Sequence, residues 1–258
     1  MHRRVDPEHS SIAPPPNPFC TRFTRPGQLS YDFSGGHFSD EVVGDGSGRG
    51  DRGGGVSVDG AAAVAIGDRL FATLRARRFG LIVGPHGSGK STLLKTLEPG
   101  LRQRFPHVRF VVLQGPPPTP ELDGKGRTIR RMGERLRQRL ANLWEVWKAG
   151  VRLPVGGLLV VDGLEQLGTG GRFVCSLGWR WRGQLVLGTA HQSLFGFREL
   201  WRTEVTPRLV TGLATRLLVR ADPRVVSSVR LAMSRRDMGR VSNVRELWFD
   251  LYDVAQDG

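Results

Sequence analysis

The sequence has few of the residues from which disulfide-stabilised or metal-binding proteins are built. It contains only two cysteines, Cys20 and Cys175. Two distant cysteines provide neither a disulfide framework nor the paired spacing of a structural metal site. A chain of this kind suits a reducing compartment, so we expect a cytoplasmic protein.

Long apolar runs are absent as well. The longest, such as residues 158–161, are far shorter than the roughly 20 residues that a membrane-crossing helix needs. The first residues, MHRRVDPEHSS, contain a basic pair without an apolar stretch behind it, so no signal peptide is predicted. We therefore expect no membrane partner.

Acidic residues are scarce relative to basic ones. The chain has 24 Asp and Glu against 38 Lys and Arg, a net charge of +14, and nearly all the cations are arginine. Such an excess suits a polyanion such as a nucleic acid. The charge is not confined to one stripe of the sequence, so a basic surface without a polyanion partner stays the alternative.

The first 60 residues differ in composition from the rest. Residues 1–16 end in a proline-rich stretch and are expected to form a disordered tail. Residues 44–60 are expected to be a glycine-rich linker. Between them, residues 17–43 are expected to pack on the folded core, because they are rich in large apolar side chains. These include Phe19, Phe23, Leu29, Tyr31 and Phe33.

Strand-like and helix-like segments alternate over the remainder, which predicts an α/β fold with a parallel sheet. The predicted strands are residues 79–83, 108–113, 158–161, 185–188 and 216–220. The predicted helices are residues 61–78, 91–97, 128–149, 223–234 and 243–255. The helix at 91–97 is expected to stop at the Pro99-Gly100 pair. We assign residues 61–220 to the core and 221–258 to a small helical, lid-like extension.

A phosphate-binding loop follows the first of these strands. Residues 84–91, GPHGSGKS, match the pattern G-x-x-x-x-G-K-[ST]. Glycines let backbone N–H groups approach phosphate oxygens, and the next helix directs its positive end at them. The predicted ATP-binding residues are Gly84, Pro85, His86, Gly87, Ser88, Gly89, Lys90, Ser91 and Thr92. Lys90 is expected to reach the β- and γ-phosphates and Ser91 to bind Mg²⁺, whereas His86 only shapes the loop.

The second half of the site is predicted at Asp162. Residues 157–162, GLLVVD, form an apolar strand that ends in a carboxylate. This resembles the Walker B element, in which Asp162 would hold Mg²⁺ through water, opposite Ser91. We expect the strand at 185–188 to lie between the Walker B strand and the strand that precedes the P-loop.

These motifs together resemble the P-loop NTPases that have an additional strand and a catalytic glutamate, a class that includes AAA+, STAND and ABC ATPases. The resemblance implies a three-layer fold with a five-stranded parallel sheet in the order 5-1-4-3-2. The run DGLEQL at 162–167 is similar to the D-G-hydrophobic-acid pattern of STAND proteins. Glu165 is therefore the candidate base that activates water. The AAA+ pattern places an acid directly after Asp162, where this chain has Gly163, and a carboxylate that only caps a helix is the alternative for Glu165.

Three further residues are candidate sensors of the γ-phosphate. Thr189 and His191 follow the fourth predicted strand, at the sheet edge where ligands collect. Arg245 lies in SNVREL, which resembles the G-N-x-R-E-L sensor stretch of the AAA+ lid, with Ser242 in place of Gly. A structural histidine is the alternative for His191, and a solvated arginine is the alternative for Arg245.

The segment before the P-loop carries one more resemblance. Its NPF…RF..PG pattern is similar to that of uncharacterised stand-alone P-loop ATPases. This implies that Phe19 or Phe23 stacks near the adenine. Arg202 or Arg208 lies where an arginine finger would come from a neighbouring subunit. The chain lacks an N-K-x-D guanine reader, which favours adenine over guanine.

The sequence therefore predicts an ATP- and Mg²⁺-binding ATPase or nucleotide switch that hydrolyses the β–γ phosphoanhydride bond and is slow without a partner. Another copy of the chain in a homo-oligomer, or a different protein, would then stimulate hydrolysis. Two other functions stay open. One is a small-molecule or nucleotide kinase with the arginine-rich helix near the phosphates, although the expected strand order argues against it. The other is a non-hydrolysing, nucleotide-stabilised interaction module, in one version bound to DNA.

Overall fold

The structure is a computed structural model of the 258-residue chain. The residues it describes are 17–20, 24–26, 30–33, 36–38, 60–115, 126–219, 221–241 and 243–257. The predicted tail, the predicted linker up to residue 59, Phe23 and Ser242 lie outside this part.

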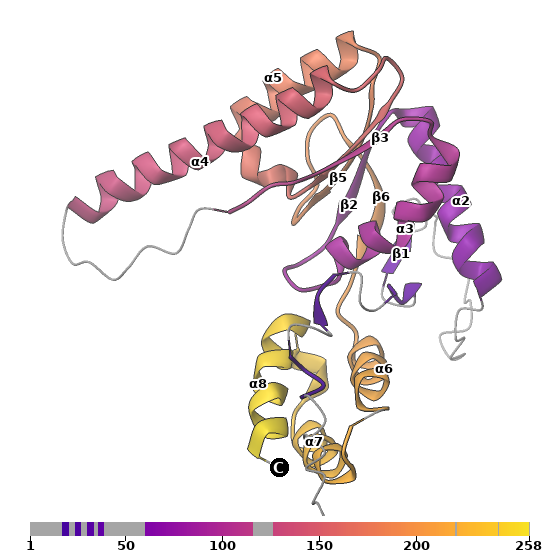
Figure 1. The fold of residues 1–258 in the computed structure, drawn as a ribbon, viewed down its shortest axis with the longest axis vertical. Helices are drawn as coiled ribbons and strands as arrows, with labels where there is room; N and C mark the ends of the chain where they lie inside the picture. Colours follow the sequence, from indigo (N-terminus) through magenta and orange to yellow (C-terminus); the bar gives the residue numbers. More distant parts are fainter. Residues whose placement is uncertain are drawn as a thin grey trace, which may run out of the picture.

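A mostly parallel sheet forms the middle layer of a three-layer α/β fold (Figure 1). Its strands are β1 (Gly36–Phe38), β2 (Phe79–Val83), β3 (Val108–Val112), β4 (Leu158–Asp162), β5 (Leu185–Ala190) and β6 (Arg198–Thr203). The spatial order is β1-β6-β2-β5-β4-β3. Every neighbouring pair is parallel except β1 and β6, which are antiparallel.

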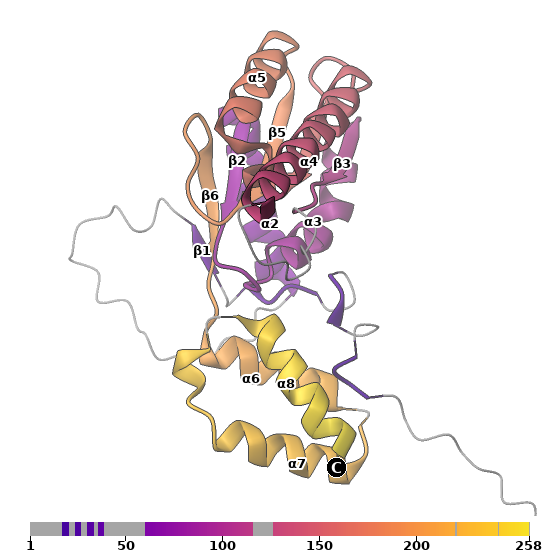
Figure 2. The ribbon, with the colours of Figure 1, turned by 90° about the vertical axis from the view of Figure 1, so that its left-hand side faces the viewer.

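Two pairs of helices cover the two faces of the sheet (Figure 2). One face carries α2 (Gly60–Arg77) and α3 (Lys90–Arg104), and the other carries α4 (Gly126–Val151) and α5 (Gly168–Trp181). Successive strand residues alternate between the faces, as the pleat requires. Ile82 and Val160 point into the core under α2 and α3, whereas Leu81 and Val161 point into the core under α4 and α5.

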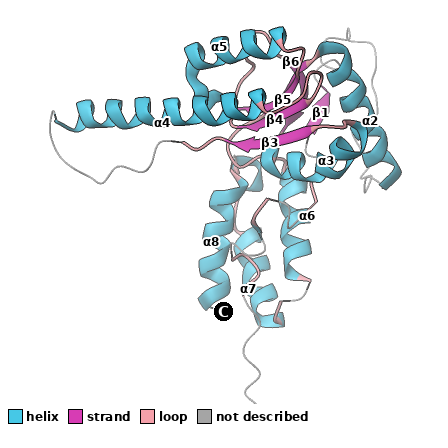
Figure 3. Ribbon diagram, turned by 45° about the horizontal axis from the view of Figure 1, so that its top comes forward, coloured by secondary structure: helices cyan, strands magenta, loops and turns pink. Residues whose placement is uncertain are grey.

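A bundle of three helices stands beside one end of the sheet (Figure 3). It consists of α6 (Pro207–Leu218), α7 (Pro223–Ser234) and α8 (Val244–Asp257). The described residues also include the short 3-10 helices η3 (Leu164–Leu167) and η4 (Met238–Arg240). The bundle has a hydrophobic core of its own, which includes Val210, Val229 and Leu251. Thus α6 packs with the bundle, although the predicted boundary at residue 220 assigns it to the core.

The sheet has six strands, whereas five in the order 5-1-4-3-2 were expected. The strand at the outer side of β2 also comes from a different segment than predicted. Residues 216–219, the described part of the fifth predicted strand, do not form a strand, because α6 extends through Leu218. Thr206 caps α6 by accepting a hydrogen bond from the Leu209 N–H, and Pro207 follows at the first helical position. The strand beside β2 is instead β6, and β1 adds a sixth strand at the edge. The expected position of β5 between β2 and β4 is confirmed.

Two helices also differ from the expectation. The predicted stop at Pro99 is wrong, because α3 continues through this proline to Arg104. Leucines at 93, 94, 97 and 101 bury one side of α3, and this burial outweighs the backbone hydrogen bond that a proline cannot make. The second difference is α5, which the sequence analysis missed because Gly168, Gly170 and Gly171 open it.

Of the helices that the structure describes, none has the length and apolar composition needed to cross a bilayer.

Candidate functional site

A cavity of about 780 Å³ opens at the carboxyl ends of the parallel strands, between the sheet and the helical bundle. Residues of the P-loop, the end of β4, the end of β5 and helix α8 line it, together with parts of the N-terminal segment. In open α/β sheets, ligands bind at this edge. The cavity therefore brings together the site residues predicted from separate parts of the sequence.

The P-loop has the backbone geometry that its glycines permit. Gly87 and Gly89 have φ angles of 71° and 88°, a left-handed region that other residues rarely adopt. Helix α3 begins directly after them, at Lys90. A Cβ on Gly84 would lie 2.0 Å from the Thr203 hydroxyl, so glycine is required where the loop packs against β6. Ser88 is buried here, with its hydroxyl 2.6 Å from that of Thr203.

Lys90 is buried, and its ammonium group lies against two carbonyl oxygens and a histidine ring. Nζ donates to the carbonyl oxygens of Gly84 and Pro85, each at 2.6 Å, and lies 3.3 Å from Nδ1 of His191. Burial lowers the pKa of Lys90, and the nearby carboxylates of Glu165 and Asp162 oppose that shift. A phosphate group entering the cavity would therefore exchange places with these partners rather than meet an exposed cation.

Asp162 ends β4, and the neighbouring strand β5 orients it. The Thr189 hydroxyl donates to Oδ1 of Asp162 at 2.6 Å and accepts a hydrogen bond from the Gly163 N–H at 2.8 Å. Thr189 is only 1% exposed. Thr189, a predicted sensor of the γ-phosphate, is therefore hydrogen-bonded to the Asp162 carboxylate and holds it in position.

Glu165 and His191 both line the cavity and contact each other there. Glu165 lies on η3, and its Oε1 is 3.0 Å from Nε2 of His191. A neutral His191 with its proton on Nε2 would donate to Glu165 while Nδ1 accepts from Lys90. The His86 ring lies against that of His191, with centroids 3.5 Å apart. Burial, the Lys90 ammonium and His86 lower the pKa of His191, whereas Glu165 raises it.

The other carboxylate oxygen of Glu165 has no hydrogen-bond partner among the described residues, although it is buried. A buried acceptor without a partner is costly unless a ligand or a water molecule satisfies it. Glu165 also lines the 780 Å³ cavity. Its position therefore fits a water molecule or a substrate group in that cavity.

Helix α8 contacts the P-loop through Asn243, a residue that the sequence analysis did not select. Asn243 caps the helix by accepting a hydrogen bond from the Arg245 N–H at 3.1 Å. Its Oδ1 lies so close to Gly87 that a Cβ on Gly87 would be 1.9 Å away. The sequence signal was its cap position in SNVREL. Arg245 itself is exposed and lines the cavity. Its guanidinium carbon, Cζ, lies 5.8 Å from the centre of the Phe249 ring.

Aromatic side chains from the N-terminal segment close one side of the cavity. The Tyr31 ring packs on the P-loop at Gly89. The backbone N–H of Tyr31 donates to the Thr96 hydroxyl on α3 at 2.9 Å. Phe19 packs against Trp248 of α8, with ring centroids 5.5 Å apart. All four side chains, Phe19, Tyr31, Trp248 and Phe249, line the cavity. Of these four, Phe19 was predicted to stack near the adenine and Tyr31 was expected only to pack on the core, whereas Trp248 and Phe249 were not predicted to lie at the site.

The oxygen donors of the site fit a magnesium ion. The Ser91 hydroxyl and the Asp162 carboxylate both line the cavity. Mg²⁺ prefers oxygen ligands and is commonly held by one or two protein groups together with substrate phosphates.

The two candidate arginine fingers are placed differently from each other. Arg202 is paired with Glu199 at 2.7 Å, whereas Arg208 is exposed on α6.

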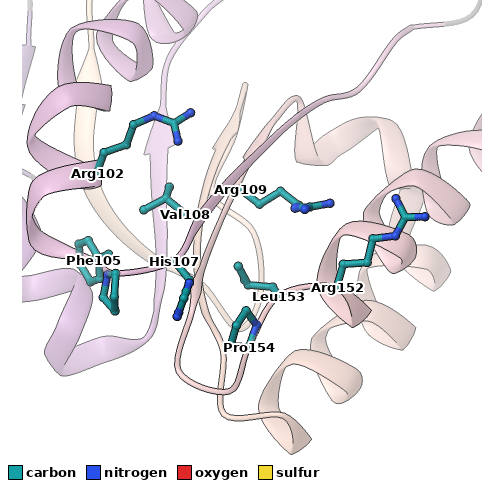
Figure 4. A pocket seen from close by; sticks show the side chains of 9 residues that line it. Arg102, Phe105, His107, Val108, Arg109, Arg152, Leu153 and Pro154 are labelled. Carbon is teal, nitrogen blue, oxygen red and sulfur yellow. The ribbon is translucent and has the colours of Figure 1, made fainter.

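A second hollow, of about 420 Å³, lies at the opposite end of β3 and β4 (Figure 4). Arg102, His107, Arg109 and Arg152 contribute to its lining. Glu98 binds the guanidinium group of Arg102 at 2.7 Å. The lining contains no carboxylate, hydroxyl or thiol. Of these two hollows, the one at the P-loop end therefore has the carboxylates and hydroxyls that can bind a metal or act as a base.

Comparison with known proteins gives matches among solved structures. No protein-family model and no curated protein matches. A DNA replication initiation factor is 14% identical with a TM-score of 0.45, over 77% of this chain and 60% of its own. AMPPCP-bound DnaA from Aquifex aeolicus is 13% identical with a TM-score of 0.42, over 79% and 63%. C. elegans PCH-2 is 10% identical with a TM-score of 0.36, over 76% and 67%. The chain thus spans about three fifths of the first two, and at scores below 0.5 its function has to be argued from its own site.

Proposed function

We propose that this protein is a P-loop ATPase or nucleotide switch that binds ATP with Mg²⁺ and hydrolyses the β–γ phosphoanhydride bond. The observation that carries the proposal is that one cavity is lined by the P-loop, by Asp162 at the end of β4 and by Glu165. These are a phosphate cradle, a metal-binding carboxylate and a base, the parts that phosphoryl transfer to water requires.

The roles follow from the contacts of each residue. The N–H groups of the P-loop and the Lys90 ammonium would hold the phosphates, with Lys90 exchanging its carbonyl partners for phosphate oxygens. Ser91 and Asp162 would hold Mg²⁺, which would neutralise phosphate charge. Thr189 keeps the Asp162 carboxylate in orientation.

Glu165 would act as the base. Its Oε1 is held by His191, and its buried, unpartnered Oε2 would accept a proton from water. The water oxygen then bonds to the γ-phosphorus, the bond from that phosphorus to the bridging oxygen breaks, and ADP and phosphate leave. His191 positions Glu165 and also contacts Lys90, so it links the base to the group that holds the γ-phosphate.

The base of the nucleotide would lie on the aromatic side of the cavity, near Phe19 and Trp248. The bundle would act as a lid, with Arg245 of α8 reaching the γ-phosphate. Asn243 contacts Gly87, so a change at the phosphates would reach the bundle directly. We further propose a cytoplasmic protein that works with copies of itself or with a partner protein. The position of β5 between β2 and β4 argues against the kinase alternative.

Phosphate release from ATP and Mg²⁺ tests the proposal. We expect Glu165→Gln to lower the release rate by about 10²- to 10⁴-fold, the usual contribution of a general base, while ATP still raises the melting temperature. The matched control is Glu145→Gln, which removes an exposed carboxylate that pairs with Lys148. Equal release by the parent and by Glu165→Gln would reject Glu165 as the base. Binding of ATP without release by the parent would leave a binding module.

A further inference from the structure

Helix α4 carries a stripe of large apolar side chains that nothing in the described part of the chain covers. Met132 is 73% exposed, Leu136 58%, Leu140 57% and Trp144 63%. These residues follow one another at intervals of four, which places them along one side of the helix. The residues that α4 buries against the sheet are others, namely Asn142, Val146 and Ala149.

Helix α5 extends this stripe into a broader face. The two helices pack together where Gly178 of α5 lies beside the Trp147 ring of α4. A Cβ on Gly178 would be 3.3 Å from that ring. On the outer side of α5, Phe173 is 67% exposed, Leu177 54% and Trp181 89%. Single exposed apolar residues are ordinary, whereas two rows of them on neighbouring helices indicate an interaction site. We refer to Met132, Leu136, Leu140 and Trp144 with Phe173, Leu177 and Trp181 as the α4–α5 face.

The charges around the α4–α5 face favour an anionic occupant. Helix α4 contains seven Arg and Lys against two Glu, and α5 contains two Arg and no acidic residue. Arg137 and Arg139 are exposed between the apolar residues of α4. A second copy of this chain would bring the same positive excess to the contact and would be repelled.

The shape of the face favours a lipid surface over a protein helix. Neither of the two cavities described above is lined by residues of this face, and the near-complete exposure of Trp181 shows that its side chain projects outward. A protein helix commonly seats its apolar side in a hydrophobic groove. In addition, α4 extends well beyond the sheet (Figures 1 and 3), so it can lie along a flat surface.

We propose that the α4–α5 face docks this protein on an anionic lipid bilayer. Amphipathic helices with Leu and Trp on one side and Arg around them lie in the plane of the membrane, with the apolar side in the headgroup region. Tryptophan favours this depth, and arginine is attracted to anionic headgroups. The docking is peripheral and needs no membrane-crossing helix, so it departs from the expectation of no membrane partner, which rested on the absence of a long apolar run. It is independent of the proposed ATPase activity and leaves the nucleotide cavity at another part of the molecule.

Co-sedimentation of the full-length protein with vesicles tests the proposal. We expect binding to mixed phosphatidylglycerol and phosphatidylcholine vesicles, weaker binding at high salt, and little binding to phosphatidylcholine alone. The double variant Trp144→Glu with Trp181→Glu should lose binding. The control, Val219→Glu with Leu231→Glu, makes the same charge change at exposed positions of the bundle and should bind as the parent does.

A second readout needs no variant. Lipids with brominated acyl chains should quench the tryptophan fluorescence of the parent if Trp144 and Trp181 enter the bilayer. Three results would overturn the proposal: no binding of the parent to anionic vesicles, no quenching by brominated lipid, or equal binding by both double variants. A parent dimer in light scattering that becomes monomeric on Trp144→Glu with Trp181→Glu would instead assign the face to self-association.

Discussion

His191 connects the two halves of the site through both ring nitrogens. Nδ1 lies 3.3 Å from the Lys90 ammonium, and Nε2 lies 3.0 Å from Glu165. A neutral ring with its proton on Nε2 can donate to Glu165 and accept from Lys90, whereas a protonated ring would place a second cation beside Lys90. The same contacts would place the ring next to the γ-phosphate in the proposed function. The protonation of this one side chain therefore affects both stability and the state of the base.

We predict that His191 makes the protein less stable as the pH falls. Burial and Lys90 hold its pKa in the folded state below its ordinary value of 6.5. The unfolded chain then binds the proton more readily, so this contribution to the free energy of unfolding is present above pH 6.5 and is lost as the pH falls. Denaturant titrations between about pH 5 and pH 8 measure it.

The control for this prediction is His107→Gln, which removes an exposed histidine at the other end of the sheet. His191→Gln should flatten the dependence of stability on pH, whereas His107→Gln should leave it as in the parent. An unchanged profile in His191→Gln would mean that His191 titrates alike in the folded and the unfolded chain.

At the scale of elements, the N-terminal segment holds the bundle to the sheet. Phe19 is 3% exposed and belongs to the core of the bundle, whereas Tyr31 and Phe33 belong to the core beneath α2 and α3. The Asn17 side chain also donates to the Tyr252 carbonyl of α8 at 2.9 Å. One short stretch of chain thus contacts both bodies that line the cavity.

We predict that Phe19→Ala weakens this connection. Truncating a buried phenylalanine costs about 3–5 kcal/mol, and here the loss also removes the ring that packs on Trp248. Thermal unfolding should start at a lower temperature, and the apparent affinity for ATP should fall. Phe195→Ala is the matched control, because Phe195 is fully exposed. The same melting temperature in both variants would contradict the connection.

Local sequence was sufficient for some elements and not for others. The P-loop and Asp162 were predictable because the pattern of each lies within about ten consecutive residues. Strand β6 was not, because its sequence RELWRT has charged residues at half of its positions and gains its place only by pairing with β2. Asn243 is recognisable locally as a helix cap, but its contact with Gly87 comes from packing between distant segments, as does the contact of Tyr31 with Gly89.

At the scale of the whole molecule, the cavity lies where the sheet and the bundle meet. A ligand that contacts both bodies stabilises both, because it binds the assembled state alone. The P-loop belongs to the sheet and Trp248 to the bundle, and the same cavity contains both. ATP should therefore act on helices that are far apart in the sequence.

We predict that ATP with Mg²⁺ slows amide hydrogen exchange in α8 as well as in α3. Ligand at about 100 times its dissociation constant adds about 2.7 kcal/mol to the free energy of unfolding. In Lys90→Ala both effects should disappear, whereas Lys95→Ala, on the exposed side of the same helix, should keep them. Protection confined to α3 in the parent would show that the bundle is not part of the nucleotide site.

The contact between Asn17 and Tyr252 has a consequence for synthesis on the ribosome. The two residues are 235 positions apart, so the segment that emerges early must wait for almost the entire chain before it finds its partner. The sheet can assemble earlier, because its strands end at Thr203. The nascent protein would then expose its P-loop without the aromatic wall of Phe19 and Trp248, and it would become able to retain a nucleotide only as α8 leaves the exit tunnel.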